Sequence, residues 1–137
     1  MSHHFTELFV HLVWSTSRRE SALEASFATR VHHQLALLCA RARAPALAVG
    51  GVADHVHLLV ALHPTVAVST LVRTLKTNTS PWIAREIHCP TIAWQNGYSA
   101  FSVHPAGTDV VRKYIQNQAQ HHASSSLINE WEPRPSP

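Results

Sequence analysis

Two histidines separated by one residue stand at the start of an apolar segment, in the sequence His55-Val56-His57. Side chains alternate along a β-strand, so both imidazoles face the same side if this segment is a strand. Their Cα atoms would then lie roughly 6.5 Å apart, and two imidazoles at that spacing can converge on one metal ion. The same pattern also fits two histidines at an ordinary sheet surface, so this motif leaves both interpretations open.

Tyr114 and Gln118 stand four residues apart in a segment with helical character, which places them on one helix face. A tyrosine at such a position is also typical of half-buried helix packing. The combination with His55 and His57 is more informative than either pair. A phenol, an amide oxygen and two imidazoles are the groups that metal-assisted phosphoryl transfer to a tyrosine requires.

This chemistry explains why a metal would be needed. A tyrosine has an ordinary pKa of about 10, so it is mostly protonated at neutral pH. A divalent ion compensates by neutralising the scissile phosphate and polarising its P–O bond. The covalent phosphotyrosine conserves the bond for a later joining step, and the sequence carries no Walker-type glycine loop, so no nucleotide cofactor is expected. Imidazoles favour zinc, nickel or copper, whereas amide, phosphate and water favour magnesium or manganese, so the donor set leaves the metal open.

The charge balance is compatible with a nucleic-acid partner, because 11 Lys and Arg residues against 8 Asp and Glu residues give a net charge of +3. The candidates for phosphate contacts are Arg18, Arg19, Arg73, Lys76, Arg85, Arg112 and Lys113. The candidates for stacking on unpaired bases are Trp14, Trp94 and Tyr98. Arg112 and Lys113 directly precede Tyr114, so at least one of them could approach the same phosphate. Core packing is the favoured interpretation for Trp14.

The composition indicates one globular domain: the chain has 137 residues, of which 45% are hydrophobic and 14% charged. No apolar run reaches the roughly 18 residues of a membrane span, and Met1–His4 lacks the apolar stretch of a secretory signal. We therefore expect a cytoplasmic protein without a membrane partner. Cys39 and Cys89 match no paired-cysteine metal pattern and are predicted to be reduced thiols.

The hydrophobic patterns predict alternating strands and helices. The expected strands are 5–14, 46–52, 55–62 and 100–103, and the expected helices are 21–42, 66–87 and 108–121. A capping box at Ser21–Glu24 would begin the first helix, and Thr108 or Asp109 would cap the last. Gly50-Gly51 could bend the second strand or form a bulge, and Pro81 could kink the second helix or start a new turn capped by Ser80.

The element order β-α-β-β-α-β-α predicts an α+β fold. It is the ferredoxin-like split β-α-β arrangement, a four-stranded antiparallel sheet with helices on one face, followed by a C-terminal helix that carries the tyrosine. We place one domain at residues 1–122. Residues 123–137 are rich in Ser, Pro and charged residues, and we expect a flexible or partner-docked tail.

Four motifs together resemble a known family. Asp54–Val60 resembles the His-hydrophobic-His (HUH) motif, and 71–76, 94–103 and 114–118 follow it in order at compatible spacing. This series resembles the single-domain HUH tyrosine transposases of small bacterial insertion sequences, and the related transposases associated with repetitive extragenic palindromes. The resemblance covers nearly the whole chain, from the first strand through the last helix.

The resemblance implies more than the spacing shows. It implies homodimers in which the tyrosine helix completes the partner's active site in trans, and recognition of DNA hairpins near element ends. It also implies cleavage of single-stranded DNA to a 5′-phosphotyrosine and a free 3′-hydroxyl, with rejoining and with Mg²⁺ or Mn²⁺ as the ion. Carried over, His55, His57 and Gln118 are the metal ligands and Tyr114 is the nucleophile.

Three other functions stay open on the sequence. An HUH replication or conjugation nickase often has a second tyrosine or third histidine and a longer chain, whereas this chain offers only Tyr98 and Tyr114. A non-catalytic module could bind single-stranded nucleic acid on a ferredoxin-like sheet. A zinc hydrolase could use His55 and His57, and it would release hydrolysed product with no protein attached.

Overall fold

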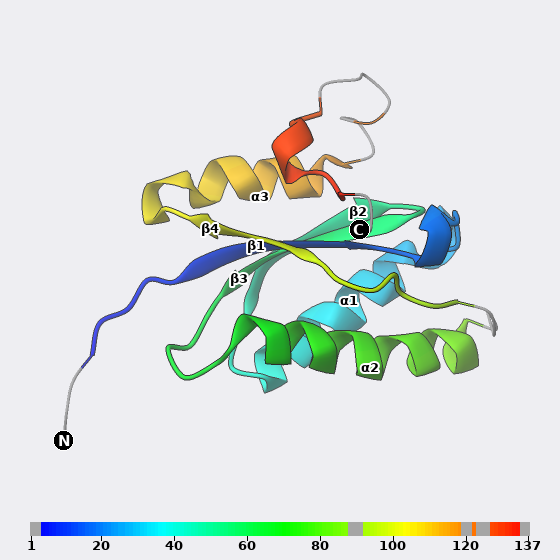
Figure 1. The fold of residues 1–137 in the computed structure, drawn as a ribbon, viewed down its shortest axis with the longest axis horizontal. Coiled ribbons are helices and arrows are strands. Elements are labelled where there is room, and N and C mark those ends of the chain that lie inside the picture. Colours follow the sequence, from blue (N-terminus) through cyan, green and yellow to red (C-terminus); the bar gives the residue numbers. More distant parts are fainter. Residues whose placement is uncertain (1–3, 88–91, 119–121, 123–126, 135–137) are drawn as a thin grey trace.

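The protein is built on one four-stranded sheet (Figure 1). The computed structural model describes residues 4–87, 92–118, 122 and 127–134. The strands are β1 (Phe9–Ser15), β2 (Ala46–Val52), β3 (His55–Ala61) and β4 (Ser99–Val103). They lie in the order β2-β3-β1-β4, and every neighbouring pair is antiparallel. This order, with the alternation of strands and helices, confirms the predicted α+β, ferredoxin-like fold.

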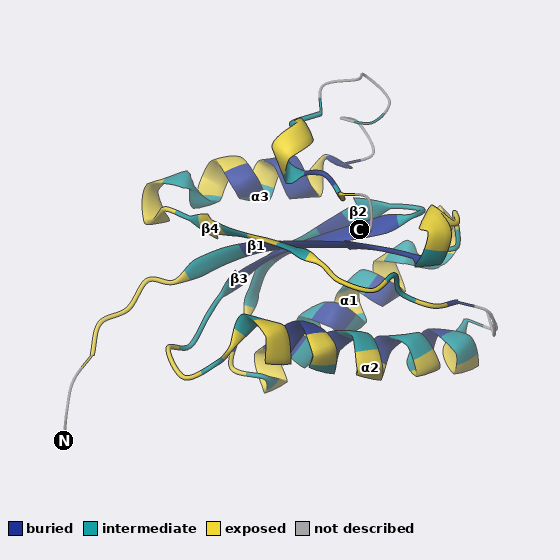
Figure 2. Cartoon of the chain, in the orientation of Figure 1, coloured by how far each residue is buried: buried dark blue, intermediate teal, exposed yellow. Residues whose placement is uncertain are grey.

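The helices divide between the two faces of the sheet (Figure 1). Helices α1 (Ala25–Arg41) and α2 (Val68–Glu86) cover one face, and α3 (Thr108–Gln116) lies on the other. Figure 2 shows that each helix buries the side that faces the sheet and exposes the opposite side. None of the described helices has the length and hydrophobicity that a membrane crossing requires.

Alternation of side chains along each strand separates the main core from the face of the sheet that α3 covers. In β3, Val56, Leu58 and Val60 enter the large cluster beneath α1 and α2, as predicted from their spacing. The intervening Leu59 joins a smaller cluster with residues of α3. His55 and His57 point to the same side of β3 as Leu59, so both imidazoles lie on the face covered by α3. We call this face of the sheet the site face.

A glycine lets α3 approach β2 closely. A Cβ atom at Gly50 would lie 2.3 Å from the backbone oxygen of Ile115, so any side chain there would push the helix away. The bulge that was one interpretation of Gly50-Gly51 does not lie at the glycines. The register of β2 against β3 shifts between Ala46 and Ala48 instead.

The side-chain caps predicted for two helices do not form. Helix α1 begins at Ala25 after Glu24, which makes no side-chain capping bond. The residues of the proposed capping box bond to another part of the chain instead, because the N–H of Leu23 donates to the oxygen of Ala53 at 2.8 Å. Helix α3 follows Gly107 without a side-chain cap. The Thr108 hydroxyl instead donates backward to Pro105, at 3.1 Å.

Other element limits also differ from the predictions. Strand β1 begins at Phe9, and Phe5 is 86% exposed outside the sheet. Helix α2 continues through Pro81, and the Ser80 hydroxyl donates to Lys76 within the helix rather than capping a new turn. Helix α3 ends at Gln116, and the predicted end at residue 121 lies outside the described residues.

The described part of the C-terminal segment, residues 127–134, includes a short 3₁₀ helix at Asn129–Trp131. This segment lies beside α3, on the site face of the sheet (Figure 1). The domain boundary at residue 122 stays a prediction. Cys39 is a buried free thiol, whose pKa burial raises to about 12, and Cys89 lies outside the described residues.

Candidate active site and metal site

The two strand histidines are held from behind through their Nδ1 atoms. His55 Nδ1 lies 2.6 Å from Asp54 Oδ1, and because a carboxylate only accepts, this nitrogen donates. His57 Nδ1 lies 2.9 Å from Nε2 of His11, which projects from β1. Both strand histidines are fully buried. These contacts leave the Nε2 atoms of both rings directed toward α3 and the C-terminal segment.

The carboxylate of Glu132 lies between these rings and the tyrosine. Its Oε1 is 3.1 Å from His55 Nε2, and its Oε2 is 3.4 Å from His57 Nε2. The Tyr114 hydroxyl donates to Oε2 at 2.5 Å. The two imidazoles and the phenol therefore surround a space of about one carboxylate group.

Gln118 and His122 complete this cluster. Gln118 Oε1 lies 3.3 Å from His55 Nε2 and 3.2 Å from His122 Nε2. His122 Nε2 also lies 3.0 Å from Glu132 Oε1. One ligand atom from each of His55, His122 and Glu132 lies within 4.8 Å of the others. The structure thus brings Gln118 to His55, as the predicted ligand set requires, and adds two residues.

The donor atoms of His55, Gln118 and Glu132 have spacings that suit one divalent ion. Ligands at about 2.1 Å from an ion are separated by about 3.0 Å in octahedral and about 3.4 Å in tetrahedral geometry. The distances from His55 Nε2 to Gln118 Oε1 and Glu132 Oε1 are 3.3 and 3.1 Å. In the described part of the chain, the buried Nε2 of His57 makes no well-oriented hydrogen bond, although Glu132 Oε2 lies 3.4 Å away. The residues present fit a metal site, although imidazole, amide and carboxylate together do not select the ion.

Tyr114 is buried and held on several sides. Its hydroxyl donates to Glu132 and accepts the N–H of Ile128 at 3.0 Å. Its ring stands edge-on to Trp131, with centroids 5.1 Å apart, and 6.0 Å from the His57 ring. Burial, followed by the hydrogen bond to Glu132, raises the pKa of Tyr114 to about 12. The phenol is therefore protonated at neutral pH in this arrangement.

The pKa values of the ionisable groups in the site are shifted in different directions. Burial lowers the pKa of His11 to about 3, with the His57 charge acting in the same direction. Burial also lowers the pKa of His57, against the opposing pull of Glu132. For His55, the contacts with Glu132 and Asp54 outweigh burial and raise the pKa. Burial opposes ionisation of Glu132, but its contacts with His55, His57 and Tyr114 hold its pKa well below the usual range.

All of these groups come from one chain. Asp54 and the histidine pair lie at and beside β3, Tyr114 lies on α3, and Glu132 lies in the C-terminal segment. Tyr114 is thus next to the histidines of its own chain. The predicted homodimer with trans active sites stays a prediction.

Some of the predicted DNA-binding cations lie near this site. Arg18 and Arg19 are exposed in a 3₁₀ turn after β1, and Arg19 pairs with Asp54 at 3.3 Å. Lys113 is exposed on α3 beside Tyr114, and Arg112 pairs with Asp109 on the same helix. Arg112 and Lys113 therefore lie on α3, and Arg18 and Arg19 lie directly after β1.

The cations of α2 lie on the other face of the sheet. Arg73 and Arg85 are exposed there. Lys76 donates to the backbone oxygens of Gln95 and Gly97, at 2.8 and 2.5 Å, so it fixes the loop before β4. The fold therefore does not bring these three residues to the histidine pair.

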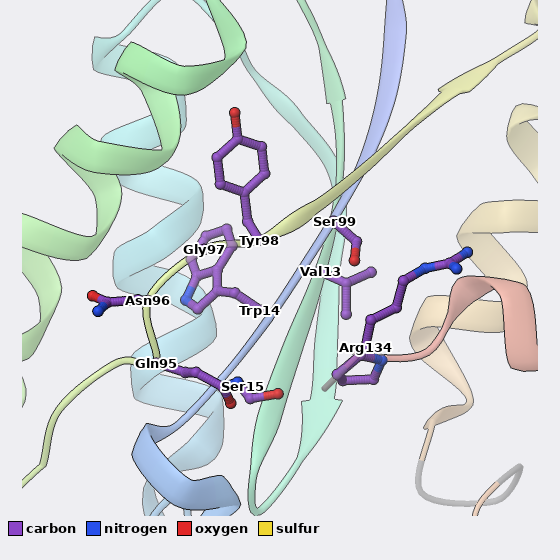
Figure 3. Close-up of a pocket in the computed structure, with 10 residues that line it drawn as sticks. Val13, Trp14, Ser15, Gln95, Asn96, Gly97, Tyr98, Ser99 and Arg134 are labelled. Carbon is purple, nitrogen blue, oxygen red and sulfur yellow. The ribbon is translucent and has the colours of Figure 1, made fainter. Parts of the chain in front are cut away.

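Among the aromatic residues predicted to stack on bases, Tyr98 is the exposed one, at 40%. Trp14 is buried in the core, and Trp94 donates to Thr79 at 2.9 Å. Tyr98 lines a pocket of 310 Å³ with residues of β1, the preceding loop and the C-terminal segment, including Arg134 (Figure 3). Because its side chain is exposed, Tyr98 remains the candidate for stacking on an unpaired base.

Sequence reasoning missed four residues of the site. Asp54 directly precedes the histidine motif, so the need for a partner at Nδ1 could have drawn attention to it. His11 lies on the site-facing parity of β1, diagonal to His57 across the strand pair. His122 and Glu132 follow α3 in the sequence, and no hydrophobic periodicity around them signals a site.

A family model decides the class of protein, because the model described as "Transposase IS200 like" matches residues 4–118. The chain belongs to the IS200-like transposase family. No curated protein matches the transposase. The match confirms the family resemblance drawn from the four motifs.

Two solved structures share the fold of the transposase. One is a protein from Deinococcus radiodurans R1 described as a transposase, 22% identical, with a TM-score of 0.65 over 86% of this chain and 95% of that chain. The other is a REP-associated tyrosine transposase bound to a REP hairpin, 14% identical, with a TM-score of 0.63 over 89% of this chain and 73% of that chain. Both likenesses support the fold described above.

Proposed function

We propose that this transposase cleaves and rejoins single-stranded DNA at hairpin-marked element ends, through a 5′-phosphotyrosine on Tyr114 and with a divalent metal. One observation carries the proposal: the Glu132 carboxylate contacts the Tyr114 hydroxyl and the Nε2 atoms of His55 and His57 together. A DNA phosphate is another compact anion with several oxygens. A phosphate in the place of this carboxylate would face both the nucleophile and the metal ligands.

In the proposed reaction, the Tyr114 oxygen forms a bond to the scissile phosphorus while the bond from phosphorus to the 3′ oxygen breaks. The phenol gives up its proton, and the leaving oxygen takes one to become a free 3′-hydroxyl. Rejoining reverses these steps with the 3′-hydroxyl of another strand. When bound, the divalent ion neutralises phosphate charge and polarises the P–O bond.

His55, His57 and Gln118 are the proposed ligands of that ion, which we propose is Mg²⁺ or Mn²⁺. Asp54 and His11 orient the two imidazoles through their Nδ1 atoms. Metal binding at His55 requires its Nε2 to lose any proton, so binding should weaken at acidic pH.

The DNA contacts are proposed from the placement of exposed cations. Arg18, Arg19 and Lys113 lie at or near the site face, where they can contact phosphates. The REP-associated relative is bound to a REP hairpin, which supports a hairpin substrate for this transposase as well. Tyr98 offers an exposed ring for an unpaired base. We also propose a homodimer with trans active sites, on the strength of the family.

Replacement of the nucleophile tests the proposal. The parent, incubated with a labelled single-stranded hairpin DNA and Mn²⁺, should form a protein–DNA adduct that survives denaturing electrophoresis and maps to Tyr114. Tyr114→Phe removes the attacking oxygen and should form no adduct and no cleaved strand. Tyr98→Phe is the matched control and should retain the adduct. Cleavage by Tyr114→Phe at the parent's rate would show that the tyrosine mechanism is wrong.

A metal-dependent hydrolase is the second candidate, favoured by one observation. His55, His122 and Glu132 form the two-imidazole, one-carboxylate set found in catalytic zinc sites. In that case the ion would activate water, and the cleaved DNA would carry no protein. The adduct assay separates the two functions, because only tyrosine attack links the DNA to the chain.

A further inference from the structure

The C-terminal segment packs against the candidate metal site through several groups. Glu132 penetrates between the two strand histidines and is only 11% exposed at its side chain. The neighbouring Trp131 packs edge-on against Tyr114 and against His11, at 5.1 and 5.7 Å between ring centroids. Ile128 donates its N–H to the Tyr114 hydroxyl. The position of Glu132 is therefore fixed by a packed segment rather than by one flexible contact.

We propose that His122 and Glu132 are metal ligands, which join His55, His57 and Gln118 in a resting coordination sphere before DNA binds. This inference rests on the proposed metal site and deepens it. It assigns two ligands from beyond the region that the family model matches, which ends at residue 118.

The distances around the two added residues carry the inference. His122 Nε2 lies 3.0 Å from Glu132 Oε1 and 3.2 Å from Gln118 Oε1. These separations fall within the range of about 3.0 to 3.4 Å expected for neighbouring ligands of one ion. Glu132 Oε1 makes no well-oriented hydrogen bond within the described residues, although three nitrogen-bearing side chains surround its carboxylate. A cation would complete the contacts of this buried oxygen.

The charges support the same arrangement. A buried carboxylate is costly unless a positive group compensates it. Around Glu132, the described side chains offer the imidazoles of His55, His57 and His122 and the neutral groups of Tyr114 and Gln118. A divalent ion at this position would place a positive charge directly beside the buried carboxylate.

The added ligands change which metal the site prefers. Three imidazoles, a carboxylate and an amide oxygen suit Mn²⁺, Co²⁺ or Zn²⁺ better than Mg²⁺, which favours oxygen and water. They also fill most coordination positions, whereas catalysis needs open ones. Since Glu132 occupies the space proposed for the scissile phosphate, ligation by Glu132 and phosphate binding exclude each other.

Metal titration of the full-length protein without DNA tests the inference. Glu132→Gln removes the anionic ligand, and His122→Asn removes the imidazole. Each variant should bind Mn²⁺ at least tenfold more weakly by calorimetry, and each should alter the visible absorption of bound Co²⁺. Glu130→Gln changes an exposed carboxylate two residues away and should bind both ions like the parent. Mg²⁺ binding should change less than Mn²⁺ binding.

A second pair of substitutions separates this inference from the proposed function. His55→Ala combined with His57→Ala should remove metal binding. If that variant loses the ion while Glu132→Gln and His122→Asn bind like the parent, the resting ligands are wrong and the proposed metal site stands. If the double variant binds like the parent, both assignments fail. Circular dichroism of each metal-free variant checks folding, and Glu132→Asp should recover part of the lost affinity if the carboxylate is a ligand.

Discussion

The two histidines of the motif have different partners at Nδ1. His55 faces the anionic carboxylate of Asp54, whereas His57 faces the buried imidazole of His11. A carboxylate partner fixes the tautomer of a histidine and makes its other nitrogen a stronger ligand. The pKa of His55 is raised, because its contacts with Glu132 and Asp54 outweigh burial, whereas burial lowers the pKa of His57. His55 is therefore the more strongly supported ligand.

At the residue scale, Asp54→Asn should weaken metal binding by about 10- to 100-fold, because it removes the charge that supports His55. Calorimetric titration with Mn²⁺ measures this effect. Arg19→Gln is the control, since it removes the exposed ion pair to Asp54 and leaves the Asp54–His55 hydrogen bond in place. Parental affinity in Asp54→Asn would contradict the positioning role of Asp54.

At the element scale, the site depends on how closely α3 lies on the sheet. Tyr114 lies on this helix and Gln118 follows its end, whereas the histidine pair lies on β3. Gly50 permits the approach, because its missing side chain leaves room for the backbone at Ile115. Val111 and Ile115 then bury their side chains against the sheet. A glycine in an edge strand thus determines the distance between the proposed nucleophile, Tyr114, and the proposed metal ligands on β3.

Gly50→Ala should displace α3, because the new methyl group would lie 2.3 Å from the Ile115 oxygen. Overpacking of this kind costs about 1–3 kcal/mol of unfolding free energy, which urea denaturation measures. Adduct formation with hairpin DNA should fall as well. Gly107→Ala is a suitable comparison, since its nearest neighbour would lie 3.8 Å from the new atom. Equal stability and adduct yield in the two variants would argue against the close-approach role.

At the scale of the whole molecule, a single chain already places the proposed nucleophile, Tyr114, beside its own histidines. Helices α1 and α2 close one face of the sheet, and α3 with the C-terminal segment covers the other (Figure 1). Strands β2 and β4 are the two edges, which offer backbone groups for pairing with another chain. The described residues bring the proposed site together within one chain, and the dimer predicted from the family would add the exchange of α3 between partners.

The dimer prediction has a direct test. Light scattering at micromolar concentration should give twice the chain mass of 15.2 kDa. Mixing Tyr114→Phe with the His55→Ala, His57→Ala variant should restore the adduct if the sites are assembled in trans. A clean monomer that retains cleavage would leave the cis arrangement as the functional one.

The sequence by itself determined the features that depend on local spacing. Alternation along a strand puts His55 and His57 on one face, and the order of elements predicts the sheet and its helices. Strand β2 has the predicted limits, since its apolar residues end where the chain turns. The predicted helix caps were wrong, because long-range bonds such as that from Leu23 to Ala53 decide where the helix begins.

Only the tertiary structure decided which elements meet. Spacing within an element fixes the direction of its side chains, but contacts between elements depend on packing across the whole chain. The His11–His57 bond therefore became visible only through the pairing of β1 with β3. The position of Glu132 was equally hidden, since it arises from the C-terminal segment folding over α3. Lys76, a predicted DNA contact, proved to hold a loop for the same reason.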